Sequence, residues 1–148
     1  METKGADSVE VGASPERVYN LLIDLGRVGE ISPECRAAQW LDGVSAPHAG
    51  ARFEGHNKNG DLEWSTECRV LRAMPGEEWA FKANVASETP TTWRYRLKRN
   101  GDGCSVTVTW DAPLLAKPGI DDVMPGRDAQ LAANAATSLA NLKRLAEA

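Results

Sequence analysis

The stretch Thr91–Trp110 reads TTWRYRLKRNGDGCSVTVTW, and both of its halves alternate apolar and polar residues around a central turn sequence. Trp93, Tyr95 and Leu97 share one side of the first half, while Arg94 and its basic neighbours lie on the other. A period of two is typical of β-strands with one buried face, and Asn-Gly-Asp-Gly is typical of hairpin turns. The stretch therefore predicts two neighbouring antiparallel strands with an aromatic inner face.

The same pattern continues from this hairpin towards the N-terminus. Turn sequences at Asp42-Gly43, Asn59-Gly60 and Pro75-Gly76 separate further strand-like runs. Short turns join antiparallel neighbours, because a parallel crossover needs about a dozen residues or more. We therefore expect a bent antiparallel meander with strands at residues 35 to 41, 51 to 58, 62 to 74, 78 to 85, 91 to 99 and 104 to 112.

The segment before the meander predicts one strand, one amphipathic helix and one further helical turn at residues 27 to 31, which ends before Ser32-Pro33. Val9 and Val11 alternate in a short strand at residues 8 to 12, which follows a flexible tail at residues 1 to 7. Ser14-Pro15-Glu16 has the form of a helix start, with serine as the N-cap and proline in the first turn. The apolar residues that follow at helical spacing predict an amphipathic helix that ends at Gly26.

The segment after the meander predicts one long helix at about residues 122 to 147. Leu131, Ala135, Leu139, Leu142 and Ala146 fall on one apolar stripe of it. A helix of this length has to lie across one face of the sheet. The fold class is therefore α+β, with a curved antiparallel sheet of about seven strands, in the order β-α-α-β6-α, wrapped around the C-terminal helix as a single domain over residues 1 to 148.

Composition excludes several classes of protein. The 17 Lys and Arg residues against 21 Asp and Glu residues give a net charge of −4, which disfavours nucleic-acid binding. No apolar run approaches the ~20 residues of a membrane span, and the N-terminal residues lack the apolar core of a secretory signal. We therefore expect a cytoplasmic protein without membrane insertion.

Few residues are suited to metal or cofactor chemistry. His48 and His56 are the only histidines, and His56 shares the outward side of its strand with Arg52 and Glu54. The three cysteines show no C-x-x-C spacing, so neither a disulfide framework nor a zinc site is expected. The sequence also lacks G-x-S-x-G, H-E-x-x-H and glycine-rich phosphate loops. We expect no metal and no cofactor.

The inward positions of the predicted strands are rich in aromatic residues, and five tryptophans account for most of the aromatic residues of the chain. These side chains form either a packed core or the wall of a ligand cavity. The alanine-rich C-terminal helix supplies little side-chain volume against a curled sheet, which favours a cavity. The candidate ligand-binding residues are Phe53, Asn57, Trp64, Thr66, Phe81, Trp93, Tyr95, Trp110, Asn134 and Ser138.

Several motifs are spread over the chain: VEV at 9 to 11, ASPERVY at 13 to 19, GEISPEC at 29 to 35, GARF at 50 to 53, WRY at 93 to 95 and LANLK at 139 to 143. Together they resemble the helix-grip superfamily of START lipid-transfer domains and Bet v 1-like proteins, in particular polyketide cyclase/dehydrase proteins of actinobacterial type. Similar proteins often carry Trp where this chain has Ile31, and the smaller residue implies more space at the cavity mouth.

The resemblance and the aromatic inner face together predict a protein that binds a small hydrophobic or aromatic molecule, polyketide-like or lipid-like. Whether it also cyclises or dehydrates this ligand is open, as is a pure carrier function. Tyr95 and Glu34 are the candidate catalytic residues for moving a proton. Glu34 follows the Ser-Pro break near the expected cavity mouth, where a position on the surface is the favoured interpretation and a catalytic role is the alternative.

A protein-interaction domain of the co-chaperone or stress type is the alternative from another class. It would use the outward basic residues Arg69, Arg94, Arg96 and Lys98 against an acidic partner, although such charges are usually only a solvated face. The sequence leaves open whether the chain is a monomer or a homodimer.

Overall fold

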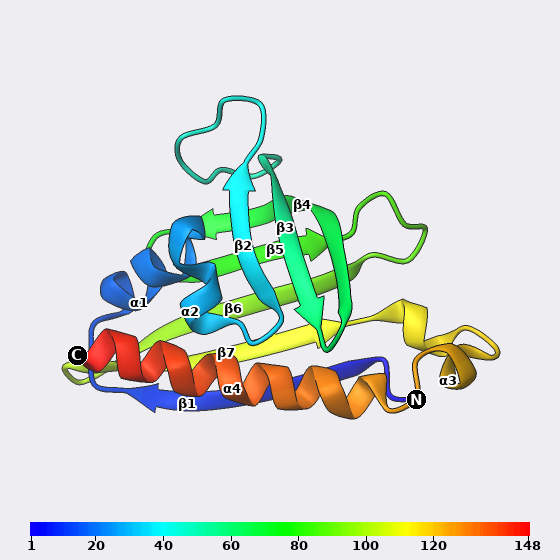
Figure 1. Ribbon diagram of the computed structural model, residues 1–148. Coiled ribbons are helices and arrows are strands. Elements are labelled where there is room, and N and C mark those ends of the chain that lie inside the picture. Colours follow the sequence, from blue (N-terminus) through cyan, green and yellow to red (C-terminus); the bar gives the residue numbers. More distant parts are fainter.

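The computed structural model describes residues 1–148 and is built around one seven-stranded antiparallel sheet (Figure 1). The strand order is β1-β7-β6-β5-β4-β3-β2, so that only β1 pairs with a strand far from it in sequence. The α+β class and the antiparallel meander are therefore confirmed. The strands are β1 (Lys4–Val11), β2 (Cys35–Trp40), β3 (Arg52–Asn59), β4 (Leu62–Met74), β5 (Glu78–Ala83), β6 (Thr91–Asn100) and β7 (Gly103–Asp111).

The hairpin turns adopt the backbone conformation that their sequences favour. Gly60, between β3 and β4, and Gly101, between β6 and β7, have φ angles of 62° and 61°. Glycine adopts this left-handed region without the steric cost of a Cβ, which keeps both connections short. These two short turns fix the register of β3 against β4 and of β6 against β7, and hence the inward side of these four strands.

Six helical segments complete the fold. Only α1 and α4 are longer than about one helical turn. Ser14 caps α1 as predicted, because its hydroxyl accepts a hydrogen bond of 3.2 Å from the backbone N–H of Arg17. None of the helices combines the length and the apolar character needed to cross a membrane. The segments are α1 (Pro15–Leu22), the 3-10 turn η1 (Leu25–Arg27), α2 (Val28–Ile31), the 3-10 turn η2 (Pro113–Ala116), α3 (Ile120–Val123) and α4 (Arg127–Glu147).

The predicted start of the C-terminal helix near residue 122 is wrong. The single turn α3 ends at Val123, and α4 begins only at Arg127. Pro125 disfavours a helical conformation at the preceding residue, and Gly126 has a left-handed φ of 69°. The chain therefore turns between α3 and α4 instead of continuing as one helix.

The prediction of a flexible tail at residues 1 to 7 is wrong from Lys4 onward, where β1 begins. Gly5 lies opposite Trp110, and the backbone of Thr3 accepts a 2.7 Å hydrogen bond from Ala112. Residues 4 to 7 have little apolar character of their own, so their strand conformation depends on pairing with β7.

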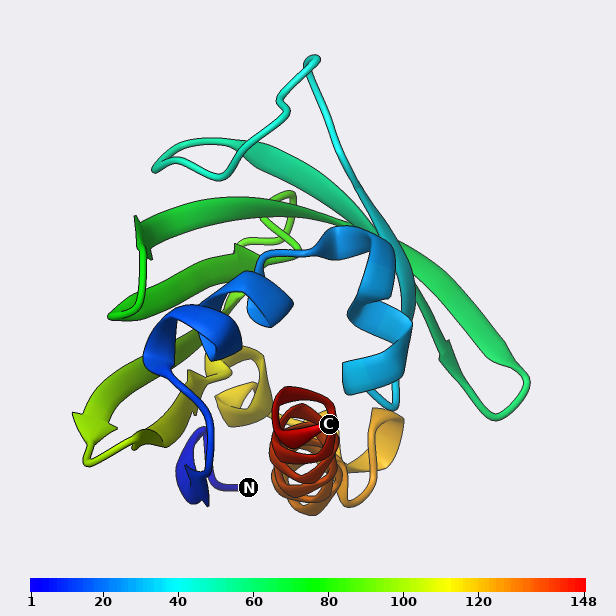
Figure 2. The same cartoon turned by 90° about the vertical axis from the view of Figure 1, so that its left-hand side faces the viewer.

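The sheet curves around α4, and Figure 2 shows this helix end-on inside the curve. The predicted apolar stripe of α4, Leu131 to Ala146, is buried against the sheet together with Val106 and Val108 of β7. Arg17 in α1 holds the far end of the helix, because its Nε donates a 2.6 Å hydrogen bond to the carbonyl of Ala146. The C-terminal half of α4 therefore contributes Leu139, Leu142 and Ala146 to the buried core.

Candidate ligand-binding site

A cavity of about 660 Å³ lies between the concave face of the sheet and α4. Its wall is formed mainly by β3 to β6, α2, the segment from η2 to α3 and the first half of α4. The exposed apolar residues Leu62 and Val123 also line it, so the cavity reaches the surface between the β3–β4 hairpin and α3. This volume falls within the ~300–1,000 Å³ that is typical of small-molecule sites.

Aromatic rings from neighbouring strands form one continuous part of the cavity wall. Phe53 of β3 stacks on Trp79 of β5 with ring centroids 6.2 Å apart, and Phe81 meets Phe53 edge-on at 5.4 Å. These residues come together because Phe53, Trp79 and Phe81 share the inward side of their strands. Flat aromatic faces of this kind can stack on a planar ligand.

One polar group of the wall lies on β3 and β4. The side-chain amide of Asn57 donates a 3.3 Å hydrogen bond to the hydroxyl of Thr66. Cys35 and Cys68 line the cavity beside them, and burial raises the pKa of both thiols, to about 11 for Cys68. Both cysteines therefore remain neutral thiols at physiological pH, poorly suited to nucleophilic chemistry.

A second polar group surrounds Glu34, which lies in the cavity wall and not on the open surface. Its carboxylate accepts two hydrogen bonds of 2.7 Å from the guanidinium of Arg127, and a third of 3.1 Å from the side-chain amide of Asn134. The side chains of Glu34 and Arg127 are each only 17% exposed. A charged pair this sheltered from water is held in a defined geometry by its own hydrogen bonds.

Tyr95 reaches the cavity from β6 and faces Ser138 of α4. Burial raises the pKa of Tyr95 to about 12, while a hydrogen bond with Ser138 acts in the opposite direction. The phenol therefore keeps its proton at neutral pH. It can donate a hydrogen bond to an oxygen atom of a ligand, whereas it is a poor base.

The structure brings all the sequence-predicted ligand-binding residues except one to the cavity wall, together with Glu34. The exception is Trp110, which is 7% exposed and packs against Trp93 with ring centroids 5.7 Å apart. Trp110 has the predicted inward side, but it lies against Gly5 of β1, in the core beside the cavity. Trp110 therefore packs against Trp93 but does not itself line the cavity.

Sequence reasoning missed Arg127 and Gln130, which line the cavity from the first turns of α4. Gln130, Asn134 and Ser138 follow one another at intervals of four residues, so they form a polar row along one side of the helix. Arg127 lies one turn before this row. The spacing of Asn134 and Ser138 was the available signal, because extending it by one turn reaches Gln130.

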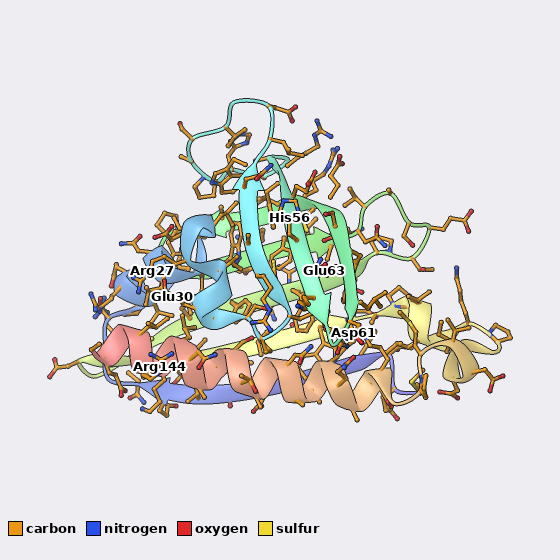
Figure 3. The ribbon with its side chains drawn as sticks, in the orientation of Figure 1. Arg27, Glu30, His56, Asp61, Glu63 and Arg144 are labelled. Carbon is orange, nitrogen blue, oxygen red and sulfur yellow. The ribbon has the colours of Figure 1, made fainter.

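The two histidines lie outside the cavity wall. His56 is on the outer side of the β3–β4 hairpin, which also carries Asp61 and Glu63 (Figure 3), and its Nδ1 is 2.9 Å from the hydroxyl of Ser65. No three side chains among His, Cys, Asp and Glu lie close enough together to hold a metal ion. The polar groups that line the cavity are hydroxyls, side-chain amides, two thiols and the ion pair of Glu34 with Arg127.

Solved structures share this fold over nearly the whole chain. The protein CV1439 from Chromobacterium violaceum has 17% sequence identity and a TM-score of 0.75, with 99% of each chain covered. The di-domain ARO/CYC StfQ from the steffimycin biosynthetic pathway has 18% identity and a TM-score of 0.75, where 98% of this chain matches 50% of StfQ. The Polyketide_cyc-like protein Cgl2372 from Corynebacterium glutamicum has 25% identity and a TM-score of 0.66, with 98% of this chain and 91% of Cgl2372 covered.

No match was found among curated proteins. One family model, described as polyketide cyclase / dehydrase and lipid transport, matches residues 2–147. This match includes every strand and helix of the fold, from β1 to α4. The chain therefore belongs to the polyketide cyclase/dehydrase and lipid transport family.

Proposed function

We propose that this protein binds a small, flat, largely apolar molecule in the cavity between the sheet and α4. The observation that carries the proposal is the cavity of about 660 Å³, whose wall is mostly hydrophobic, includes six aromatic rings and carries polar side chains from the sheet and from α4. Sites for small molecules have this composition, because apolar walls supply affinity and a few polar groups fix orientation.

The arrangement of the wall supports one orientation of the ligand. The rings of Phe53, Phe81 and Trp93 belong to the sheet, whereas Asn134 and Ser138 belong to α4 on the opposite side. A planar ligand that stacks on the sheet would turn one edge towards α4. Hydrogen-bonding groups along that edge, such as carbonyls or phenols, would meet Asn134, Ser138 and Tyr95.

Calorimetric titration with emodin, a flat hydroxylated anthraquinone, tests the binding proposal. Ala83 lines the cavity, so Ala83→Trp fills part of it and is expected to weaken emodin binding at least tenfold. Ser65→Trp adds the same side chain on the exposed outer side of the sheet and leaves binding unchanged. Equal affinities of both variants and the parent, or a failure of the parent to bind any flat aromatic probe, contradict the proposal.

Native mass spectrometry of the freshly purified protein complements this titration, because it detects a co-purifying ligand of unknown identity. A bound small molecule that disappears in Ala83→Trp supports the cavity as the binding site. Quenching of tryptophan fluorescence by the same molecule is expected to be large, because Trp64, Trp79 and Trp93 line the cavity.

Cyclisation or dehydration of the bound molecule is the second candidate, and the protonated phenol of Tyr95 favours it. The hydroxyl group is available to donate a proton or hydrogen bond to a ligand carbonyl, which makes the adjacent carbon more reactive. The carboxylate of Glu34 accepts three hydrogen bonds, so it would have to exchange one of them for a ligand before it could act as a base.

Variants at these two residues separate catalysis from carriage. If the ligand is converted, Tyr95→Phe and Glu34→Gln retain binding but lose most of the turnover, detected as a change in ligand mass. Unchanged turnover in both variants contradicts a proton-transfer role for these residues. Binding by the parent without any change in ligand mass identifies a carrier.

A further inference from the structure

The outer face of β4, β5 and β6 carries a dense group of cations. Figure 2 shows this side of the three strands turned away from α4 and hence from the cavity. The strand register places the group on one surface, since Arg69 pairs with Lys82 and Ala80 lies between Arg72 and Arg94. We call this group the basic strip, and its members are Arg69, Arg72, Lys82, Arg94, Arg96 and Lys98.

Only one carboxylate lies inside the basic strip, and three arginines converge on it. Glu78 is 14% exposed at its side chain, in contact with Arg94 and with the Nε atoms of Arg72 and Arg96 at 3.5 Å and 3.8 Å. Each guanidinium has five N–H donors, while one carboxylate accepts about four hydrogen bonds. Glu78 therefore leaves most of the donors of these arginines without a protein acceptor.

The remaining three cations of the basic strip are Arg69, Lys82 and Lys98. None of them has a carboxylate oxygen within 4.0 Å, so they form no ion pair. Arg69 and Lys82 lie directly opposite each other on neighbouring strands. Like charges in this position destabilise a sheet. On β7, which borders the group beside β6, the outward residues from Ser105 to Thr109 are uncharged, so the cations are concentrated on β4, β5 and β6.

We propose that the basic strip is a docking surface for an acidic protein segment in an extended conformation. The chain has a net charge of −4, so the concentration of six cations on one face runs against its overall composition. Glu78 shows within the molecule which group the strip holds, namely a carboxylate between guanidinium forks. Such electrostatic complementarity accelerates association and selects partners by charge.

The spacing of the cations suits an extended segment. Arg94, Arg96 and Lys98 occupy alternate positions of one strand, which places them about 6.8 Å apart along β6. An extended peptide with Glu or Asp at every second residue presents carboxylates with the same repeat. The outer face carries Met74 as its only exposed large apolar side chain, and the tryptophans face inward, so neither membrane insertion nor base stacking is favoured here.

A labelled peptide of alternating Glu and Ser is the probe, with the alternating Gln and Ser peptide as its control. Fluorescence anisotropy at about 0.01 M ionic strength, where the screening length is ~30 Å, is expected to show binding of the Glu peptide only. The triple variant Arg69→Gln, Lys82→Gln, Lys98→Gln leaves all three contacts to Glu78 intact and is expected to weaken binding roughly tenfold.

A matched variant removes three unpaired, exposed cations elsewhere: Arg36→Gln, Lys58→Gln, Lys117→Gln. It has the same net charge as the strip variant, and we expect it to bind the Glu peptide nearly as well as the parent. Equal weakening in both triple variants, or no binding of the Glu peptide by the parent at low ionic strength, overturns the proposal. Emodin binding by the strip variant reports the cavity separately, so failure of the docking proposal does not affect the cavity proposal.

Other occupants of the basic strip give other results in the same series. Strip-dependent binding to single-stranded oligothymidylate or to phosphatidylglycerol vesicles that is tighter than binding to the Glu peptide overturns the proposal. Self-association of the parent at low salt that disappears in the strip variant, measured by sedimentation, identifies a second copy as the occupant and also overturns it.

Discussion

Replacing Gly5 by alanine is expected to destabilise the protein through the indole ring of Trp110. Gly5 of β1 lies opposite Trp110 of β7, and a Cβ at this position would lie 2.0 Å from Cζ2 and 2.3 Å from Cε2 of the indole. The indole therefore has to move by about 1.4 Å to restore an ordinary contact of 3.4 Å. Trp110 is 7% exposed and packs on Trp93, so little free space is available for this movement.

Two opposing contributions to the free energy of unfolding set the size of the loss in the Gly5→Ala variant. Overpacking of a well-packed core costs about 1–3 kcal/mol. Alanine in place of glycine returns about 0.4–1 kcal/mol, because the unfolded chain has fewer conformations to lose. The expected net loss is about 1.5 kcal/mol, which for a chain of this size corresponds to a fall in Tm of roughly 3–6 °C.

Thermal unfolding followed by circular dichroism measures this shift, and Gly26→Ala is the matched control. A Cβ on Gly26 meets only Asp24 Oδ1, at 3.4 Å, so this substitution is expected to leave Tm unchanged or slightly raised. In a Trp110→Phe background, which lacks the indole atoms that clash, Gly5→Ala is expected to cost much less. An unchanged Tm for Gly5→Ala, or the same loss in both backgrounds, refutes this explanation.

Three further outcomes are expected. Arg127→Gln lowers the free energy of unfolding by about 1.5–3 kcal/mol in urea denaturation, because Glu34 loses both charged hydrogen bonds. If the losses of Arg127→Gln and Glu34→Gln are purely additive in the double variant, the two residues are not coupled. The folded pKa of Tyr95, about 12, lies above the unfolded value of about 10, so its ionisation leaves stability unaffected below pH ~10 and lowers it between pH ~10 and 12. Tyr95→Phe removes that part of the fall, and an identical pH profile in this variant contradicts the assignment. Leu142→Ala, at a fully buried position, lowers the free energy of unfolding by about 2–5 kcal/mol, whereas Leu62→Ala at the cavity rim changes it by no more than about 0.5 kcal/mol. Similar Tm values for both variants would contradict the burial pattern.

Much of the fold follows from local sequence signals. The Asn59-Gly60 and Asn100-Gly101 turns place the boundaries of four strands to within a residue or two, because a short hairpin fixes both of its arms. The inward side of each strand follows from alternation alone, which is why Phe53, Trp93 and Tyr95 were assigned correctly to the concave face. Signals of this kind act over a few residues and are visible without any tertiary structure.

The parts that escaped prediction depend on contacts between distant segments. β1 extends back to Lys4 only because β7 supplies its hydrogen-bonding partners, which no pattern in residues 4 to 7 reveals. Glu34 lies in the GEISPEC motif and was expected near the cavity mouth, but its ion-pair partner Arg127 is 93 residues away and belongs to no recognisable motif. The inward side of Trp110 was predictable, but its distance from the cavity depends on how far the sheet curls.

The one long-range pairing of the sheet, β1 with β7, has a consequence for how the chain folds. The strands from β2 to β7 can assemble from successive hairpins, whose connections are at most eleven residues long and close at low entropic cost. β1 is synthesised first but has to wait for about 100 residues to emerge before its partner exists, a delay of roughly 5–20 s at typical translation rates. During that time Val9 and Val11 lack their native partners, so the N-terminal segment completes its folding late and its apolar residues can meet other partners first.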